Sequence, residues 1–259
     1  KGTVILLFQP AEEAEHGGEK VVNTGMFEKY KIEKIFGLHT KQNMPVGTIA
    51  IAPGPFSAAV DRFLYTVKGM GCHGSAPQTG LDPIPAAARL VGSLQEIVSR
   101  RISTTETAVI SVTRFTSGTS WNIIPETARL EGTVRTFNPK VREQIVKLMQ
   151  AQAEGLEREG YQVEFTWIPG CPATNNDADL AELVRKEAME EGFHVTLQHP
   201  EMGGEDFSCY QELVPGAFFH VGTGGKYPAH NSKFTVDPAA LLGASKLISE
   251  IVKKALKAS

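Results

Sequence analysis

The sequence has few cysteines, no long apolar run and no excess of charge of either sign. Its three cysteines, Cys72, Cys171 and Cys209, form no C-x-x-C pair, which argues against a disulfide framework and against a structural zinc finger. No apolar run approaches the roughly 20 residues needed to span a bilayer, and the first residues lack the features of a signal peptide. We therefore expect a soluble, cytoplasmic protein that does not bind membranes.

The charge balance also argues against nucleic acid as a partner. Lys and Arg number 26 and Asp and Glu number 29, which gives a net charge of −3, so no global field would attract a polyanion. With 259 residues, of which 41% are hydrophobic, the chain can form one large domain or two modest ones. It starts at Lys1 rather than at an initiator Met, and the apolar run at residues 4–8 follows at once. This run predicts a buried strand and suggests a fragment with a segment missing upstream.

The order of the expected elements predicts an α/β fold split in sequence. The first part, residues 1–57, reads as strand (4–8), helix (18–27) and strand (35–39), and it ends at the turn cluster 53–55. Residues 169–259 return to the same rhythm after a second turn cluster. We expect a helix at 177–191 capped by Asn175 or Asn176, a strand at 217–221 and a closing helix at 238–257.

The middle of the chain, residues 58–168, has the pattern of a separate domain. Six elements are expected there in β-α-β-β-α-β order, at 60–67, 83–101, 107–115, 127–137, 139–160 and 161–168. This order is that of the ferredoxin-like split βαβ arrangement. The sequence therefore predicts a ferredoxin-like (βαββαβ) domain inserted into the α/β domain.

Two adjacent carboxylates, Glu12 and Glu13, follow the first expected strand, at a position where α/β folds build their sites. Neighbouring side chains diverge by about 100° on a helix and about 180° on a strand, so the two cannot do the same task. One could bind a metal while the other points at a metal-bound water. A solvated acidic turn is the alternative interpretation.

Two histidines stand in comparable positions. His39 closes the second expected strand, and His230 lies in a loop after the Gly-rich stretch 222–225. Imidazole together with carboxylate suits zinc, manganese, cobalt or nickel. Taken singly, each histidine could equally be a hydrogen-bonded structural residue.

One motif would indicate nucleotide binding, but the helix that this motif requires is missing from its position. Residues 69–74 match G-x-G-x-x-G, the dinucleotide fingerprint. That fingerprint needs a helix to begin on the loop itself, whereas Pro77, Gly80 and Pro83 delay the next expected helix by about nine residues. We therefore do not expect a nucleotide site.

Seven blocks, in order along almost the whole chain, together resemble the M20 metallopeptidase family. They are FQPAEE (8–13), GLH (37–39), GCHGSAP (71–77), NIIP (122–125), GTVRT (132–136), MGGEDF (202–207) and HNSKF (230–234). The chain is most similar to the amidohydrolase branch of that family, which contains hippurate hydrolases, N-acyl-L-amino acid amidohydrolases and auxin-conjugate hydrolases.

The resemblance implies a role for each site residue. Glu12 would be the general base, and Glu13, His39 and His230 would bind two divalent metal ions. His73, in the inserted domain, would stabilise the oxyanion, commonly in the partner subunit's site. Three further residues would bind substrate, two of them at its carboxylate: Asn122, Arg135 and Gly204.

The resemblance also implies an architecture, that of a metal-dependent catalytic domain carrying a ferredoxin-like lid, often a homodimer through that lid. Two departures stand out. The family's upstream Cys-Gly-His metal motif is absent, and Gln78 stands where the branch often has a second lid histidine. Arg135 also has a plainer interpretation, because Arg129, Glu131, Thr133 and Arg135 alternate along a strand as a polar face would.

The expected activity is hydrolysis of the amide bond of an N-acyl amino acid or a related small amide. Glu12 would take a proton from a metal-activated water and pass it to the departing amine. Two alternatives remain, a dipeptidase or aminopeptidase with the same machinery and a non-catalytic M20-like binding protein.

Overall fold

The computed structural model describes residues 2–13 and 17–257, which form two compact units. Unit 1 comprises Lys1–Ser57 and Thr174–Ser259, and unit 2 comprises Ala58–Ala173. No helix in the described part is long and apolar enough to cross a membrane.

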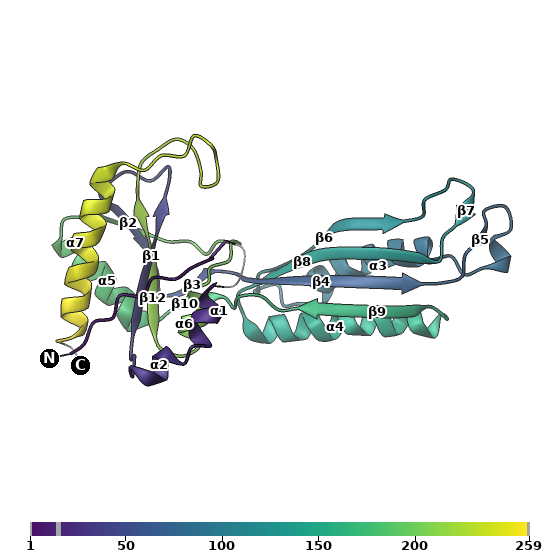
Figure 1. Ribbon diagram of the computed structural model, residues 1–259, viewed down its shortest axis with the longest axis horizontal. Helices are drawn as coiled ribbons and strands as arrows, with labels where there is room; N and C mark the ends of the chain where they lie inside the picture. The colour runs from purple at the N-terminus through teal and green to yellow at the C-terminus, as the bar shows by residue number, and fades with distance from the viewer. Residues whose placement is uncertain (1, 14–16, 258–259) are drawn as a thin grey trace. The chain divides into compact units, whose positions relative to one another are not determined.

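Unit 1 is built on a mixed four-stranded sheet with helices on both faces (Figure 1). Its strand order is β1 (Ile35–Lys41), β12 (Gly216–Gly222), β2 (Thr48–Ile51) and β11 (His194–Leu197). β1 and β12 run parallel, β12 and β2 antiparallel, and β2 and β11 parallel. The parallel pair β1–β12 brings the carboxyl ends of two strands to one edge of the sheet.

The helices of unit 1 bury the two faces of this sheet in separate clusters. On one face pack α5 (Ala178–Glu190) and α7 (Pro238–Ala255), with Val184, Leu247 and Phe219 fully buried between helix and sheet. On the other lie α1 (Gly17–Val22), α2 (Met26–Lys29) and α6 (Ser208–Gln211). The aromatic cluster there contains Phe27, Phe56, Phe207, Tyr210 and Phe218. A short antiparallel pair, β3 (Gly54–Ser57) with β10 (Thr174–Asn176), lies where unit 2 leaves and rejoins unit 1.

Unit 2 has a four-stranded antiparallel sheet in the order β6-β8-β4-β9. The elements along the chain are β4 (Ala59–Lys68), α3 (Pro83–Glu96), β6 (Ala108–Ser117), β8 (Thr127–Thr136), α4 (Pro139–Arg158) and β9 (Gln162–Ile168). A π-helical turn, Ile97–Arg101, extends α3. The apolar stripes of the two helices cover one face of the sheet and bury Phe63, Tyr65 and Ile145.

Both long helices of unit 2 begin with a proline preceded by a capping side chain. The Asp82 carboxylate accepts from the Ile84 amide before α3, and the Asn138 side chain accepts from the Lys140 amide before α4. Proline at the first helical position has no amide hydrogen to leave unsatisfied. The sequence therefore fixes where each helix starts.

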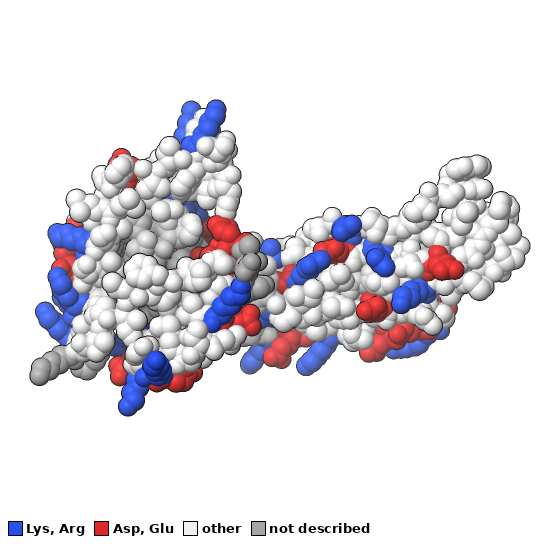
Figure 2. Space-filling model, in the orientation of Figure 1, with Lys and Arg blue, Asp and Glu red and all other residues white. Residues whose placement is uncertain are grey.

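The other face of the unit 2 sheet is polar. Glu131 on β8 pairs with Arg62, and its other oxygen lies 3.8 Å from Arg114 Nη1. Figure 2 shows acidic and basic groups interspersed over unit 2. Beyond the Thr127 end of β8, a small two-stranded ladder pairs β5 (Cys72–His73) with β7 (Ile123–Ile124), and a 3₁₀ turn (Pro77–Thr79) follows β5.

Three predictions about local structure are wrong. The expected helix at 18–27 is two short helices, α1 and α2, separated by a turn at residues 23–25 where Gly25 has a left-handed backbone. Residues 4–8 are not a buried strand: the segment is irregular, and Leu6 and Phe8 are 77% and 88% exposed. A strand needs a hydrogen-bonded neighbour, and no strand in the described part pairs with this segment. The cap of α5 is neither Asn175 nor Asn176 but Asp177, whose carboxylate accepts from the amides of Asp179 and Leu180.

Candidate metal and catalytic site

Glu12 and Glu13 lie in unit 1, in the segment between the irregular N-terminal stretch and α1. Both side chains are exposed. Ala11, directly before them, has a left-handed backbone with φ of 55°. Non-glycine residues in this region are uncommon and cluster at functional sites.

His39 lies near the carboxyl end of β1, beside His220 of the parallel strand β12. Its Nδ1 is 2.7 Å from the backbone oxygen of Thr40. Because a carbonyl oxygen can only accept, Nδ1 donates to it, which leaves Nε2 as the nitrogen that could bind a metal. A hydrogen bond of this kind fixes the tautomer in metal-binding histidines.

His230 lies in the loop that follows β12 and also has a left-handed backbone, with φ of 66°. Its Nε2 is 3.7 Å from Glu13 Oε1. The two side chains are 71% and 70% exposed, so the carboxylate and the imidazole meet in an open position. The fold thus brings together residues from opposite ends of the chain.

Electrostatic interactions place Glu12 among the same residues. Although Glu12 is exposed, partial desolvation of its carboxylate, and then the charges of Glu13 and Asp206, raise its pKa above its ordinary value. His39 and His230 act on that pKa in the opposite direction. Glu12, Glu13, His39 and His230 are therefore electrostatic neighbours in unit 1, called the cluster below, and Glu13 and His230 are the pair with a direct approach of 3.7 Å.

Two carboxylates that were not singled out in advance adjoin this cluster. Glu205 and Asp206 directly follow Gly204, which is exposed on the loop that leads into α6. Burial raises the pKa of Glu205 to about 7, and the nearby charge of Glu12 acts in the same direction. Asp206 is 3% exposed and accepts a hydrogen bond from Gln9. The sequence block at 202–207 marked this loop as part of the resemblance, but the block alone does not show which of its residues lie beside the cluster.

His220 is the other buried polar group beside the cluster. Its Nδ1 is 2.9 Å from Gln198 Oε1, and its ring packs on Phe56 with centroids 4.7 Å apart. Burial, and next the positive charge of Lys41, lower the pKa of His220 to about 4. The imidazole is therefore neutral at ordinary pH.

The expected residues of unit 2 fall in two separate places. His73 on β5 pairs with Ile123, and the Gly74 amide donates to the Asn122 oxygen over 2.9 Å. His73 thus lies in the small β5–β7 ladder at one end of the unit (Figure 1), and Asn122 directly precedes its strand β7. The Nδ1 of His73 is 2.7 Å from the Ser75 hydroxyl oxygen.

Arg135 lies toward the opposite end of unit 2, on strand β8 of the four-stranded sheet, where it pairs with Val60 of β4. From Thr127 to Arg135 the strand advances roughly 27 Å at about 3.4 Å per residue, and the ladder lies beyond Thr127. Arg135 donates to the Val134 oxygen over 3.1 Å and also to the Thr133 hydroxyl. Within one unit 2, His73 and Arg135 therefore cannot contact the same small molecule.

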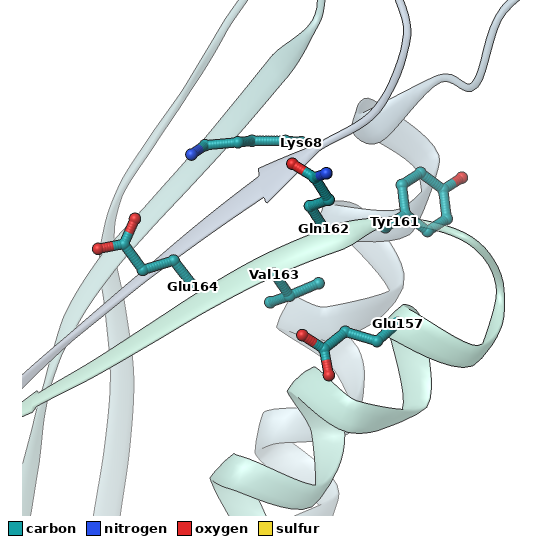
Figure 3. Close-up of a pocket in the computed structure, with 6 residues that line it drawn as sticks. All are labelled: Lys68, Glu157, Tyr161, Gln162, Val163 and Glu164. Atoms are coloured by element: carbon teal, nitrogen blue, oxygen red, sulfur yellow. The ribbon is translucent and has the colours of Figure 1, made fainter.

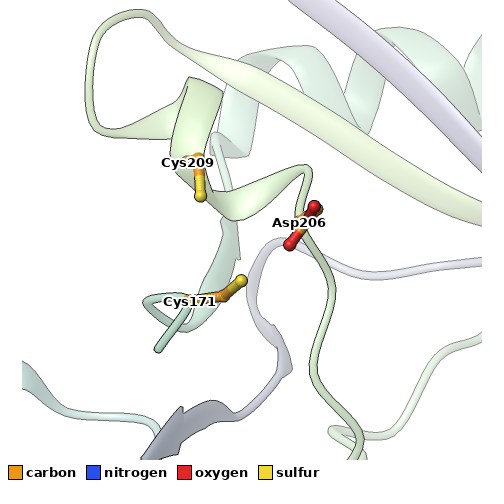
Figure 4. A group of neighbouring side chains, drawn as sticks. All are labelled: Cys171, Asp206 and Cys209. Carbon is orange, nitrogen blue, oxygen red and sulfur yellow. The ribbon is translucent and has the colours of Figure 1, made fainter. Parts of the chain in front are cut away.

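Other features of the surface do not coincide with these residues. A shallow hollow in unit 2 lies between the end of α4 and the strands β9 and β4 (Figure 3), lined by Lys68, Glu157, Tyr161, Gln162, Val163 and Glu164. None of the expected site residues lines it. Figure 4 labels Asp206 and Cys209, which lie just before and within α6 of unit 1. Cys171, drawn with them, belongs to unit 2 and is not counted in the site.

The chain belongs to the peptidase family M20/M25/M40, whose model matches residues 1–254. The family confirms the resemblance drawn from the seven sequence blocks. It also agrees with the mixed α/β fold seen in the structure.

Similar curated proteins include several deacetylases. The chain is 42% identical over 252 residues to N-acetylcysteine deacetylase of Bacillus subtilis (strain 168), covering 97% of this chain and 66% of that protein. It is 33% identical over 257 residues to N-acetyldiaminopimelate deacetylase of Bacillus pumilus (strain SAFR-032), covering 98% and 68%. The chain thus spans about two thirds of the length of these relatives.

A solved structure has the same fold. The Bacillus subtilis YXEP protein, described as a dinuclear metal binding peptidase from the M20 family, aligns with a TM-score of 0.82 and 38% identity. The alignment covers 96% of this chain and 64% of that one.

Proposed function

We propose that the protein is a metal-dependent amidohydrolase that removes the acyl group from N-acyl amino acids. The observation that carries this proposal is the cluster of Glu12, Glu13, His39 and His230, in which Glu13 and His230 lie 3.7 Å apart. Acetyl is the acyl group in the names of both deacetylase relatives, so N-acetyl amino acids are the first substrates to test.

The donor atoms of the cluster fit divalent metals. Glu13 offers a carboxylate, and His39 and His230 offer imidazole nitrogens, a set that suits zinc, manganese, cobalt or nickel. We propose that these three residues contribute to a dinuclear centre, since the similar YXEP protein is described as binding two metals. Bound metals would supply Lewis-acid polarisation of the amide carbonyl and would lower the pKa of a water molecule.

Glu12 is proposed as the general base. Burial and the neighbouring carboxylates raise its pKa, which moves a carboxylate toward the range in which it can both take and return a proton at neutral pH. In this role Glu12 accepts a proton from the attacking water and then delivers it to the departing amine nitrogen.

Unit 2 is proposed as a ferredoxin-like lid that supplies substrate contacts. The βαββαβ order and the strand order β6-β8-β4-β9 support this assignment. His73 Nδ1 accepts from the Ser75 backbone amide over 3.2 Å, so Nε2 carries a hydrogen and can donate to an oxyanion, a role worth about 10²–10³ in rate. Arg135 is half-buried, and desolvation lowers its pKa, so an anionic partner such as a substrate carboxylate would stabilise it.

The separation within unit 2 supports a homodimer in which two chains build each site. Since His73 and Asn122 lie far from Arg135 in the same unit, one substrate can contact all three only if two copies of unit 2 contribute. We propose that Arg135 of one chain and His73 and Asn122 of its partner contact the same substrate.

A substrate panel tests the proposal against its alternatives. Full-length protein is assayed on N-acetyl, N-benzoyl and dipeptide substrates with Zn²⁺, Mn²⁺, Co²⁺ or Ni²⁺ added in turn. Turnover of N-acyl amino acids above dipeptides is the expected result. Preference for dipeptides would indicate a peptidase, and binding without turnover of any substrate would indicate a binding protein.

A further inference from the structure

A single carboxylate oxygen is bonded to both ends of the segment that carries Glu12 and Glu13. Gln9 Nε2 donates to Asp206 Oδ2 over 3.1 Å, and the Gly18 backbone amide donates to the same oxygen over 2.8 Å. Gln9 precedes the segment and Gly18 follows it. Asp206 thus holds Gln9 and Gly18, which stand on either side of Glu12 and Glu13 in the sequence, at one oxygen.

The surroundings of Asp206 make this anchor rigid. Asp206 is 3% exposed, and a buried carboxylate is stable only when its oxygens accept hydrogen bonds. A Cβ added at Gly18 would lie 2.5 Å from the Asp206 backbone oxygen, so the close approach needs glycine. A Cβ added at Gly17 would lie 1.7 Å from the Pro10 oxygen, which shows that the two ends of the segment also touch each other.

A second residue orients the anchor from the other side. The Tyr210 hydroxyl donates to Gln9 Oε1 over 2.5 Å, so the oxygen and the nitrogen of the Gln9 amide are both held. Tyr210 is itself buried and stacks on Phe27 with ring centroids 5.4 Å apart. The left-handed backbone of Ala11 lies inside the fixed segment, and such conformations persist where the surrounding structure over-determines them.

We propose that Asp206 is a positioning residue that fixes the direction of Glu12 and Glu13 by holding both ends of their segment. This proposal rests on the proposed function, because the residues that Asp206 would position are the ones proposed to carry out that reaction. Loss of this positioning should slow the reaction, because a misplacement of about 1 Å in catalytic groups can lower the rate on the order of 10²-fold.

The test compares Asp206→Ala with a matched control, Asp177→Ala, in full-length protein. Asp177 also lies in unit 1 and also accepts from two protein N–H groups, but at the start of α5. Backbone hydrogen exchange, metal per chain, kcat and KM are measured for each variant. Asp206→Ala should raise exchange in residues 9–25 by about tenfold or more, as expected when anchoring hydrogen bonds are lost. It should also lower metal content, and kcat should fall by about tenfold or more with KM changed much less.

The control should leave exchange in residues 9–25, metal content and kcat near wild type. If Asp206→Ala fails to fold, Gln9→Ala replaces it, because Gln9 is only partly buried and its loss removes one of the two bonds to Asp206. Wild-type exchange across residues 9–25 in the folded variant would overturn the proposal. Faster exchange with unchanged metal content and kcat would overturn it as well. Absence of amidase turnover in the wild-type protein would instead refute the proposed function, while the exchange and metal measurements would still decide whether Asp206 orders the segment.

Discussion

Glu13 and His230 meet at 3.7 Å although one lies near the beginning of the chain and the other in the loop after the last strand. Their meeting depends on β1 and β12, the parallel neighbours that bring His39 and the start of the His230 loop to one edge of the sheet. Glu12, the proposed base, and Glu13, the proposed metal ligand, are adjacent in sequence but have different proposed roles, so single substitutions can distinguish them.

Glu12→Gln and Glu13→Gln should fail in different ways. A glutamine at position 12 cannot take a proton, so turnover should be lost while metal per chain stays near wild type. A glutamine at position 13 is a poorer metal ligand, so both metal content and turnover should fall. Elemental analysis of the purified variants, beside the kinetic assay, decides between the roles. Equal loss of metal from both would show that the assignment is wrong.

Mixing two inactive variants tests whether His73 acts in the partner's site. His73→Ala alone should lower kcat by about 10²-fold or more without loss of metal. When His73→Ala and Glu12→Gln chains are dissociated and reassembled together, activity should return to about one quarter of wild type, since half of the dimers are mixed and each has one intact site. Mixtures with no more activity than the separate variants would mean that the partner does not supply His73.

The buried ion pair of unit 2 should dominate its charge-dependent stability. Asp61 is fully buried and is held by Arg142 through Nε, 2.8 Å from Oδ2, and through Nη2, 2.5 Å from Oδ1. Arg142→Met would leave the carboxylate without its cation, and we expect unfolding in urea to become easier by about 3 kcal/mol.

The matched control is Arg89→Met. Arg89 pairs with Glu159, and both side chains are about half exposed, so the cost should be below about 1 kcal/mol. Similar costs for the two variants would contradict the importance given to burial.

Glu205 should make the stability of the metal-free protein depend on pH. Burial raises its pKa from the ordinary 4.5 to about 7 in the folded state. Between these values the folded state binds more protons than the unfolded state, so the contribution to stability is complete at low pH and is lost as pH rises from about 4.5 to about 7.

Urea unfolding in the presence of a chelator measures this effect. From pH 5 to pH 7.5 the wild-type protein should lose about 2 kcal/mol relative to Glu205→Gln, which cannot titrate at this position. Parallel pH profiles for the two proteins would show that Glu205 has an ordinary pKa.

The sequence predicted the regular elements of unit 2 well because their signals are local. Apolar stripes at helical spacing and strict alternation along β8 survive in the structure as buried and exposed faces. The starts of the helices at Pro83 and Pro139 were also predicted correctly, because a proline at the first helical position directly follows a capping residue in each case.

Other features depend on partners that a local pattern does not show. Residues 4–8 have the composition of a buried strand, but strand formation requires a neighbour, and the segment is irregular and largely exposed. The short strands β2 and β11 were not predicted, because four apolar or mixed residues give little periodicity.

The candidate site shows the same division. Glu12, Glu13, His39 and His230 were singled out by residue type and position, and of these the structure places Glu13 and His230 3.7 Å apart. Asp206 was passed over, because its importance comes from two hydrogen bonds to residues almost 200 positions away in sequence. Its neighbour Glu205 is an ordinary carboxylate until burial changes its pKa.

The chain passes from unit 1 to unit 2 after Ser57 and returns before Thr174, and this arrangement affects which insertions unit 1 can accept. The Ser57 hydroxyl donates to the Thr174 hydroxyl over 2.6 Å, and these residues flank unit 2 within a strand pair of unit 1. Unit 2 is therefore equivalent, for unit 1, to a long loop whose two ends are held together by the Ser57–Thr174 contact. Loop-closure entropy grows by only about 0.6 kcal/mol for each doubling of loop length. An insertion of different size, or a short turn, would therefore be accommodated at this point at little cost to unit 1. Unit 2 can therefore change in size while the sheet of unit 1 keeps its architecture.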